Sequence, residues 1–200
     1  IAGLAMMRGM LGRPGCGLLP LRGHSNVQGM GSLGVVPRLK ETVLENLQAH
    51  FGVTLPEEEG LDTLACIERA HAGGIDAALC LGGNLFGSNP DQAFASKALR
   101  EVGLLVHMST TLNTGHACGL GKETIILPVQ ARDEEAQSTT QESMFSFVRV
   151  SDGGEARHEG PRSEVEVIAD LAERIAAEAP VDWVEMRKHA SIRSAIAKIV

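Results

Sequence analysis

The chain has 200 residues, enough for one domain with a sizeable core, and a formal net charge of −7. This acidic balance argues against nucleic acid as a partner, because phosphate backbones bind to basic surfaces. No apolar run approaches the roughly 18 residues that a membrane-spanning helix needs. The cysteines form no Cys-x-x-Cys pair, which argues against a zinc or iron–sulfur site and fits the reducing cytoplasm. They are Cys16, Cys66, Cys80 and Cys118.

The first 37 residues are irregular in pattern. The chain opens at Ile1 inside an apolar helical pattern, without a methionine or a basic leader, so we expect a piece of a longer protein. Residues 1–12 are predicted to end a helix, and residues 13–37 to form a long glycine-rich loop. Gly29, Gly31 and Gly34 make a G-x-G-x-x-G motif, but the residues before it are too polar for the strand that a dinucleotide fingerprint follows.

The chain is organised around residues 75–102. An apolar run of strand length, 75–81, leads into Gly82 and Gly83, which can adopt positive φ and let a ligand approach the backbone. A helix start follows, with Asn89 as the expected N-cap. Because helix N-termini direct free N–H groups at such loops, this is where open α/β sheets bind nucleotides. An ordinary connection from strand to helix would show the same local pattern.

Other elements complete an α/β pattern. Helices are predicted over 39–51 and 61–72, strands over 104–107 and 123–128, and a further strand over 144–150 after a polar stretch. The strand at 104–107 is followed by a fringe of hydroxyl and amide side chains that suits a heterocycle. These side chains are Ser109, Thr110, Thr111, Asn113 and Thr114. Capping boxes predict helices from Ser163 and from Asp182.

The expected fold is α/β, with a doubly wound, mostly parallel sheet, helices on both faces and a helical C-terminal part. We divide it into residues 1–37, residues 38–160 as the α/β nucleotide-binding domain, and residues 161–200 as helices that pack on it or lead onward. Catalytic motifs are scarce: the sequence has no Gly-x-Ser-x-Gly elbow and no histidine pair with metal spacing.

Three blocks of the sequence resemble a known family. They are residues 21–29, residues 81–91 together with 111–114, and residues 126–128 followed by 137–153. The blocks are similar to the molybdopterin oxidoreductases, in the branch of the formate dehydrogenase alpha subunits, and the tail from Arg162 onward is similar too. The resemblance covers nearly the whole chain.

The resemblance implies a cofactor and its contacts. Such enzymes hold molybdenum or tungsten between two molybdopterin guanine dinucleotides, and a domain of this kind grips the nucleotide end of one of them. The loop from residue 22 to 28 would approach the pterin and the metal. The implied cofactor-binding residues are His24, Ser25, Asn26, Gly82, Gly83, Asn84, Ser88, Asp91, Ser109, Thr110, Asn113 and Thr114.

The resemblance also implies a catalytic role for Arg22, whose planar guanidinium can orient a small anion. This chain has His24-Ser25 where the formate enzymes have Gln-Asn, which puts formate as the substrate in doubt. No metal ligand is expected in this chain. The metal ligand and any iron–sulfur cysteines would lie upstream of Ile1, so the piece alone is expected to be inert. Its implied partners are the rest of its own chain, a small-molecule substrate and an electron-transfer partner of the parent.

Two other functions stay open. One is a nicotinamide-dependent Rossmann dehydrogenase that uses Gly29, Gly31 and Gly34, against which the missing strand argues. The other is a non-catalytic nucleotide-binding or interaction module on the same α/β plan.

Overall fold

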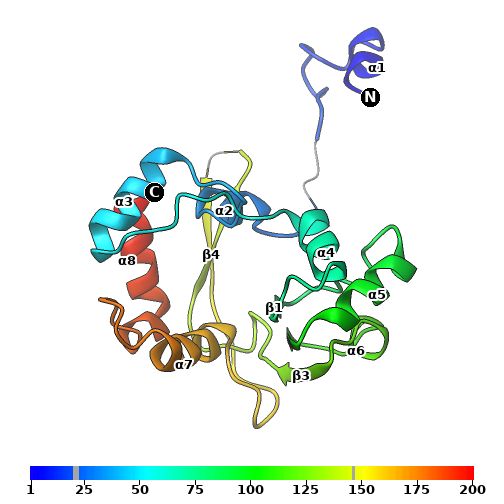
Figure 1. Ribbon diagram of the computed structural model, residues 1–200. Helices are drawn as coiled ribbons and strands as arrows, with labels where there is room; N and C mark the ends of the chain where they lie inside the picture. The colour runs from blue at the N-terminus through cyan, green and yellow to red at the C-terminus, as the bar shows by residue number, and fades with distance from the viewer. Residues whose placement is uncertain (20–22, 146) are drawn as a thin grey trace.

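A computed structural model describes residues 1–19, 23–145 and 147–200 (Figure 1). The helices are α1 (Ala2–Met7), α2 (Val27–Ser32), α3 (Glu41–Phe51), α4 (Thr63–His71), α5 (Gln92–Glu101), α6 (Gly115–Cys118), α7 (Glu164–Ile175), the 3-10 turn η1 (Glu185–Arg187) and α8 (His189–Ile199). The strands are β1 (Ala77–Leu81), β2 (Leu104–Ser109), β3 (Glu123–Pro128), β4 (Thr139–Ser143) and β5 (Phe147–Ser151).

A parallel sheet with strand order β1-β2-β3 forms the first part of the fold. Helices α4 and α5 lie side by side against one of its faces. The core there joins Ile67 of α4, Leu99 of α5 and Leu105 of β2, which are 1%, 2% and 0% exposed. The predicted α/β fold with a parallel sheet is therefore confirmed.

The other face of this sheet carries apolar side chains as well. Leu79 pairs in register with Val106, which pairs with Ile125, so the three side chains project to the same side. Leu79, Leu81 and Ile125 remain 48%, 51% and 46% exposed. We call these three residues the open sheet face. Parallel sheets are normally covered on both faces, which explains why these strands are apolar on both sides.

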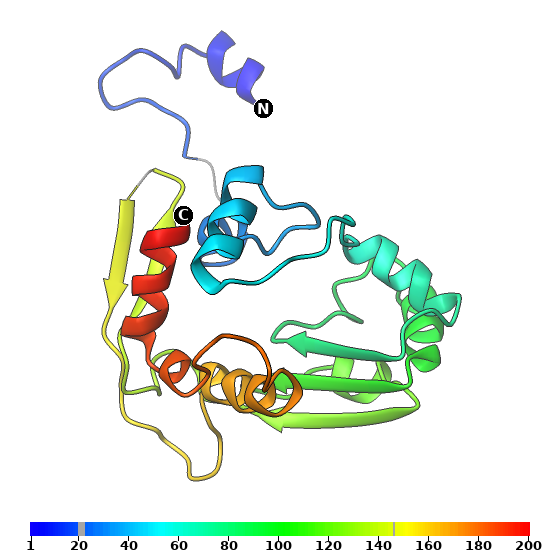
Figure 2. The ribbon, with the colours of Figure 1, turned by 60° about the vertical axis from the view of Figure 1, so that its left-hand side comes forward.

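A second group of elements surrounds the antiparallel β4–β5 hairpin. Figures 1 and 2 show α2, α3, α7 and α8 around it, with α1 standing apart. Helices α3 and α8 pack through Val43, Ala195 and Ile199, and the Asn46 side-chain amide donates to the Ile199 carbonyl oxygen at 3.0 Å. Gln130 N–H donates to the Arg162 carbonyl oxygen at 2.9 Å, which ties the segment after β3 to the start of α7.

Three local features differ from the sequence prediction. Helix α2 lies in the segment expected to be irregular, and it contains Gly29 and Gly31 of the G-x-G-x-x-G motif. Strand β4 lies mostly within the polar stretch 130–142, for which no strand was predicted. Helix α5 begins after Asp91, whose carboxylate accepts from Phe94 N–H at 2.9 Å, so Asp91 and not Asn89 is its N-cap.

Candidate functional site

The carboxyl ends of the three parallel strands meet at one edge of the sheet. Strand β1 leads directly into Gly82 and Gly83, whose φ values are +66° and +69°. A Cβ atom built on either glycine would meet no heavy atom within 4 Å. Open space therefore lies next to a stretch of backbone whose conformation other residues rarely adopt. This agrees with the predicted positive φ of both glycines, which would let a ligand approach the backbone.

Two asparagines join the loops that follow β1 and β2. The Asn84 amide nitrogen donates to Thr114 Oγ1 at 2.8 Å, and the Asn113 amide nitrogen donates to the Gly83 carbonyl oxygen at 2.9 Å. Their amide oxygens accept from Gly87 N–H at 2.7 Å and from Gly115 N–H at 2.8 Å. We call Asn84, Asn113, Thr114 and Gly83 the asparagine clasp.

Several residues predicted to contact the cofactor therefore already have protein partners. Asp91 caps α5, and the Ser109 hydroxyl donates to the Thr111 carbonyl oxygen at 2.8 Å. Ser88 and Thr110, in contrast, are exposed next to these loops. The structure thus divides the predicted residues into those that build the edge of the sheet and those that present side chains to solvent there.

A polar cavity of about 610 Å³ lies beside the same edge. Thr110 lines it from the end of β2, Ser25 and Asn26 line it from the loop before α2, and Thr139 lines it from β4. Thr139 Oγ1 is a buried atom without a hydrogen-bond partner in the described part of the chain. The fold thus brings residues of the first and third sequence blocks to one cavity, beside Thr110 at the end of β2. Gly82, Gly83 and Asn84 do not line it.

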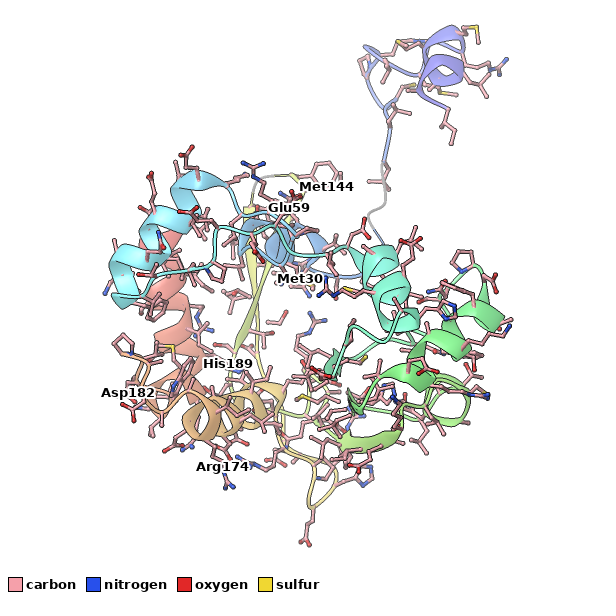
Figure 3. The ribbon with its side chains drawn as sticks, in the orientation of Figure 1. Met30, Glu59, Met144, Arg174, Asp182 and His189 are labelled. Atoms are coloured by element: carbon pink, nitrogen blue, oxygen red, sulfur yellow. The ribbon has the colours of Figure 1, made fainter. Side chains whose placement is uncertain are left out.

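Ionisable residues that the sequence did not single out form one wall of this polar cavity. His189, at the start of α8 (Figure 3), has its Nε2 atom 2.9 Å from a Glu135 carboxylate oxygen and its Nδ1 atom 3.1 Å from the Ser138 carbonyl oxygen. Burial raises the pKa of the Glu164 carboxyl, and the nearby charge of Glu135 raises it further. No signal in the sequence pointed to this pair, because Glu135 lies between the two parts of the third block and His189 lies far from it.

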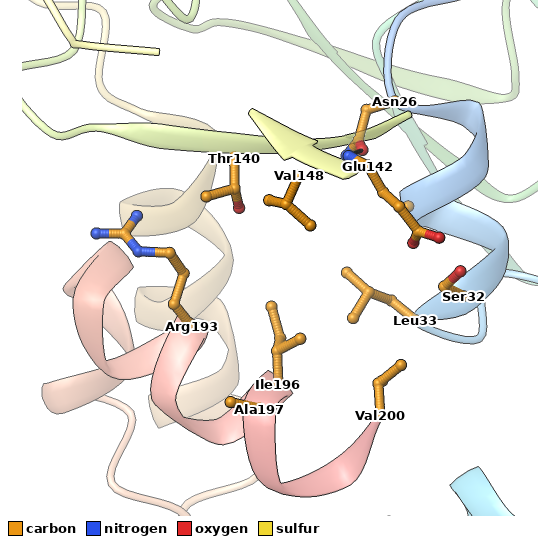
Figure 4. Close-up of a pocket in the computed structure, with 11 residues that line it drawn as sticks. Asn26, Ser32, Leu33, Thr140, Glu142, Val148, Arg193, Ile196, Ala197 and Val200 are labelled. Carbon is orange, nitrogen blue, oxygen red and sulfur yellow. Dashed lines mark hydrogen bonds between the residues drawn. The ribbon is translucent and has the colours of Figure 1, made fainter. Parts of the chain in front are cut away.

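A separate apolar cavity of about 290 Å³ lies between α2, the hairpin and α8 (Figure 4). Leu33, directly after α2, Val148 of the hairpin and Ile196 of α8 project into it. Asn26 borders both cavities, and its side-chain oxygen accepts from Glu142 N–H at 2.9 Å. The loop before α2 is thereby held against the hairpin.

Two further residues of the predicted pterin-side loop have different outcomes. His24 is exposed and lines neither of them. Arg22, the predicted catalytic residue, lies outside the described residues.

Comparison with known proteins gives the family. No protein-family model matches the chain. The uncharacterized oxidoreductase Rv2900c of Mycobacterium tuberculosis is 35% identical across the whole chain, which corresponds to 27% of that protein. Protein YdeP of Escherichia coli is 32% identical over 92% of the chain and 25% of its own length. A putative formate dehydrogenase of Staphylococcus haemolyticus, SH0748, is 30% identical over 53% of the chain and 12% of its own length.

The chain belongs with these oxidoreductases, which include a putative formate dehydrogenase. It spans about a quarter of the length of these first two relatives. Within the described part of this oxidoreductase domain, no three histidine, cysteine or acidic residues are grouped as a metal site would require. No helix there is long and apolar enough to cross a membrane.

Proposed function

We propose that this oxidoreductase domain binds the guanine-nucleotide end of molybdopterin guanine dinucleotide. The observation that carries the proposal is the open space beside Gly82 and Gly83 at the carboxyl edge of a parallel sheet. In open α/β sheets this edge is the usual nucleotide site, because the strand ends and helix N-termini converge there. The resemblance of the three sequence blocks to molybdopterin oxidoreductases supports the identity of the nucleotide, and the oxidoreductase relatives agree with it.

The residues at this edge fit the group. The backbone of residues 82–84 can approach a diphosphate without hindrance from a side chain, and Ser88 and Thr110 offer hydroxyl groups beside it. Other predicted residues shape the loops at this edge through their hydrogen bonds, namely Asn84, Asp91, Ser109, Asn113 and Thr114. When bound, the cofactor would supply molybdenum or tungsten for two-electron transfer.

We propose that the pterin side of the cofactor lies toward the polar cavity. The buried, unpartnered Thr139 Oγ1 supports this, because a heterocycle with hydrogen-bonding groups would satisfy it. Ser25 and Asn26 line that cavity and would border the pterin, with the exposed His24 next to them outside the cavity wall. Arg22 would orient an anionic substrate. The His24-Ser25 pair, which departs from the Gln-Asn of the formate enzymes, favours a substrate other than formate.

The arrangement of the glycine motif disfavours the nicotinamide alternative. Gly29 and Gly31 lie within α2. The described residues directly before this helix, 23–26, form bends and turns and not a β-strand. A Rossmann fingerprint requires its glycines in the turn between a strand and a helix. A non-catalytic nucleotide-binding module remains the second candidate, because it would use the same sheet edge.

Isothermal titration of the chain with GDP, ADP and NAD tests the proposal. We expect GDP to bind more tightly than ADP, and the double variant Ser88→Ala/Thr110→Val to bind GDP about tenfold more weakly. Ser194→Ala, which removes an exposed hydroxyl on α8, is the matched control and should leave GDP binding unchanged. Preferential binding of NAD, or no binding of GDP, would refute the proposal.

A further inference from the structure

We propose that Asn84 and Asn113 are positioning residues, which fix the shape of the nucleotide loops through the asparagine clasp and do not contact the ligand with their side chains. This inference rests on the proposed function. It reassigns two residues whose sequence positions alone suggested direct contacts.

The orientation of both amides is fixed by backbone donors. Gly87 N–H donates to the Asn84 side chain and Gly115 N–H donates to the Asn113 side chain. A backbone N–H cannot accept a hydrogen bond, so an amide oxygen must face it in each case. Each amide NH₂ group is thereby directed at the other loop, 30 residues away in sequence.

The amides lie close over two glycine backbones, where a larger residue would not fit. A Cβ atom on Gly87 would lie 2.5 Å from the Asn84 amide nitrogen, and one on Gly115 would lie 2.6 Å from the Asn84 amide oxygen. The amides therefore fill the space above two glycines. The clasp also holds the carbonyl of Gly83, next to the open space where the ligand is proposed to lie.

The two halves of the clasp differ in a way that can be tested. Asn84 donates to a hydroxyl group, which can rotate and become the donor, whereas Asn113 donates to a backbone carbonyl, which can only accept. In Asn84→Asp, the Thr114 hydroxyl can donate to the new carboxylate. In Asn113→Asp, the carboxylate faces the Gly83 carbonyl oxygen and no donor lies between them.

The experiment combines GDP titration with thermal unfolding of the full chain. We expect Asn84→Asp to keep GDP affinity within about threefold, and Asn113→Asp to bind GDP about tenfold more weakly with a lower unfolding temperature. Asn84→Asp/Thr114→Val should behave like Asn113→Asp, because the hydroxyl donor is removed. Asn89→Asp adds the same charge to the same loop and is the matched control.

Three results would overturn the inference. If Asn84→Asp loses GDP affinity but not stability while Asn89→Asp does not, Asn84 contacts the ligand directly. If Asn113→Asp lowers the unfolding temperature but the folded protein binds GDP normally, the clasp is only structural. If the unaltered chain does not bind GDP, the proposed nucleotide site and the positioning role both fail. A lower unfolding temperature of Asn113→Asp than of Asn84→Asp would in that case show that the clasp is only a structural link between the loops.

Discussion

The imidazole rings of His107 and His116 meet edge to face, with 5.0 Å between their centroids and 86° between their planes. His107 projects from β2 and is 7% exposed, and its Nε2 atom lies 3.4 Å from the Gly119 carbonyl oxygen. His116 Nδ1 accepts from Asn113 N–H at 2.9 Å. The ring pair therefore connects the core of the sheet to the asparagine clasp.

The buried position of His107 predicts a pH dependence of stability. Burial lowers the pKa of His107, the proximity of His116 lowers it further, and the contact with the Gly119 carbonyl opposes the shift. The unfolded chain, with the ordinary His107 pKa of 6.5, binds the proton more readily, so the stabilising contribution is present above this pH and is lost as the pH falls below it. Urea unfolding at about pH 7.5 and about pH 5.5 should show a smaller decrease for His107→Gln than for the unaltered chain. An equal decrease in both would contradict this.

The left-handed conformation of Gly83 predicts a cost for any side chain there. We expect Gly83→Ala to lower the free energy of unfolding by about 1–2 kcal/mol through backbone strain alone, because its Cβ atom would meet no neighbour. Gly83→Asn should cost less, since asparagine tolerates this conformation better. Gly17→Ala, at an exposed glycine without positive φ, is the control for equilibrium urea unfolding. Equal stability of Gly83→Ala and Gly17→Ala would argue against the strained loop.

The N-cap of α5 gives a direct comparison of two candidate residues. Asp91→Ala should lower the free energy of unfolding by about 1 kcal/mol, because Phe94 N–H loses its acceptor. Asn89→Ala should change it by less than about 0.5 kcal/mol. Guanidinium unfolding of both variants measures the difference, and the reverse order would restore Asn89 as the cap.

The contact between α4 and the sheet predicts a large difference within one helix. Ile67 is 1% exposed in the core under α4, whereas Leu64 on the same helix is 59% exposed. We expect Ile67→Ala to reduce the free energy of unfolding by about 2–5 kcal/mol and Leu64→Ala by less than about 0.5 kcal/mol. Chemical unfolding followed by circular dichroism would test both. Comparable losses would show that Leu64 is also buried in solution.

The sequence predicted best the elements that local patterns specify. The apolar run of β1, the two glycines after it and the cap of α7 at Ser163 were predicted correctly, since each depends on residues close in sequence. Helix α2 was missed because glycines at positions 29 and 31 give it low intrinsic helix propensity. Its packing against β4, and the bond from Glu142 N–H to Asn26, come from residues far along the chain.

The sequence could place polar side chains at the sheet edge but could not show what they contact. Asn84 and Asn113 follow two strand ends, and a ligand or a neighbouring loop would explain them equally well at that stage. Strand β4 was missed because its residues, Thr139–Ser143, show no alternation of apolar and polar side chains. Its strand conformation depends instead on hydrogen-bonded pairing with β5. The pairing of Glu135 with His189 likewise depends on tertiary structure.

The open sheet face has a practical consequence for work with this chain. Leu79, Leu81 and Ile125 form adjoining apolar surface on strands whose opposite side is already packed. Water in contact with this surface favours association of two such faces, and that tendency grows with protein concentration. The solubility of the isolated chain is therefore expected to be limited by this face rather than by its unfolding. A polar replacement at Leu79 should extend the usable concentration range while leaving the helix-covered core intact.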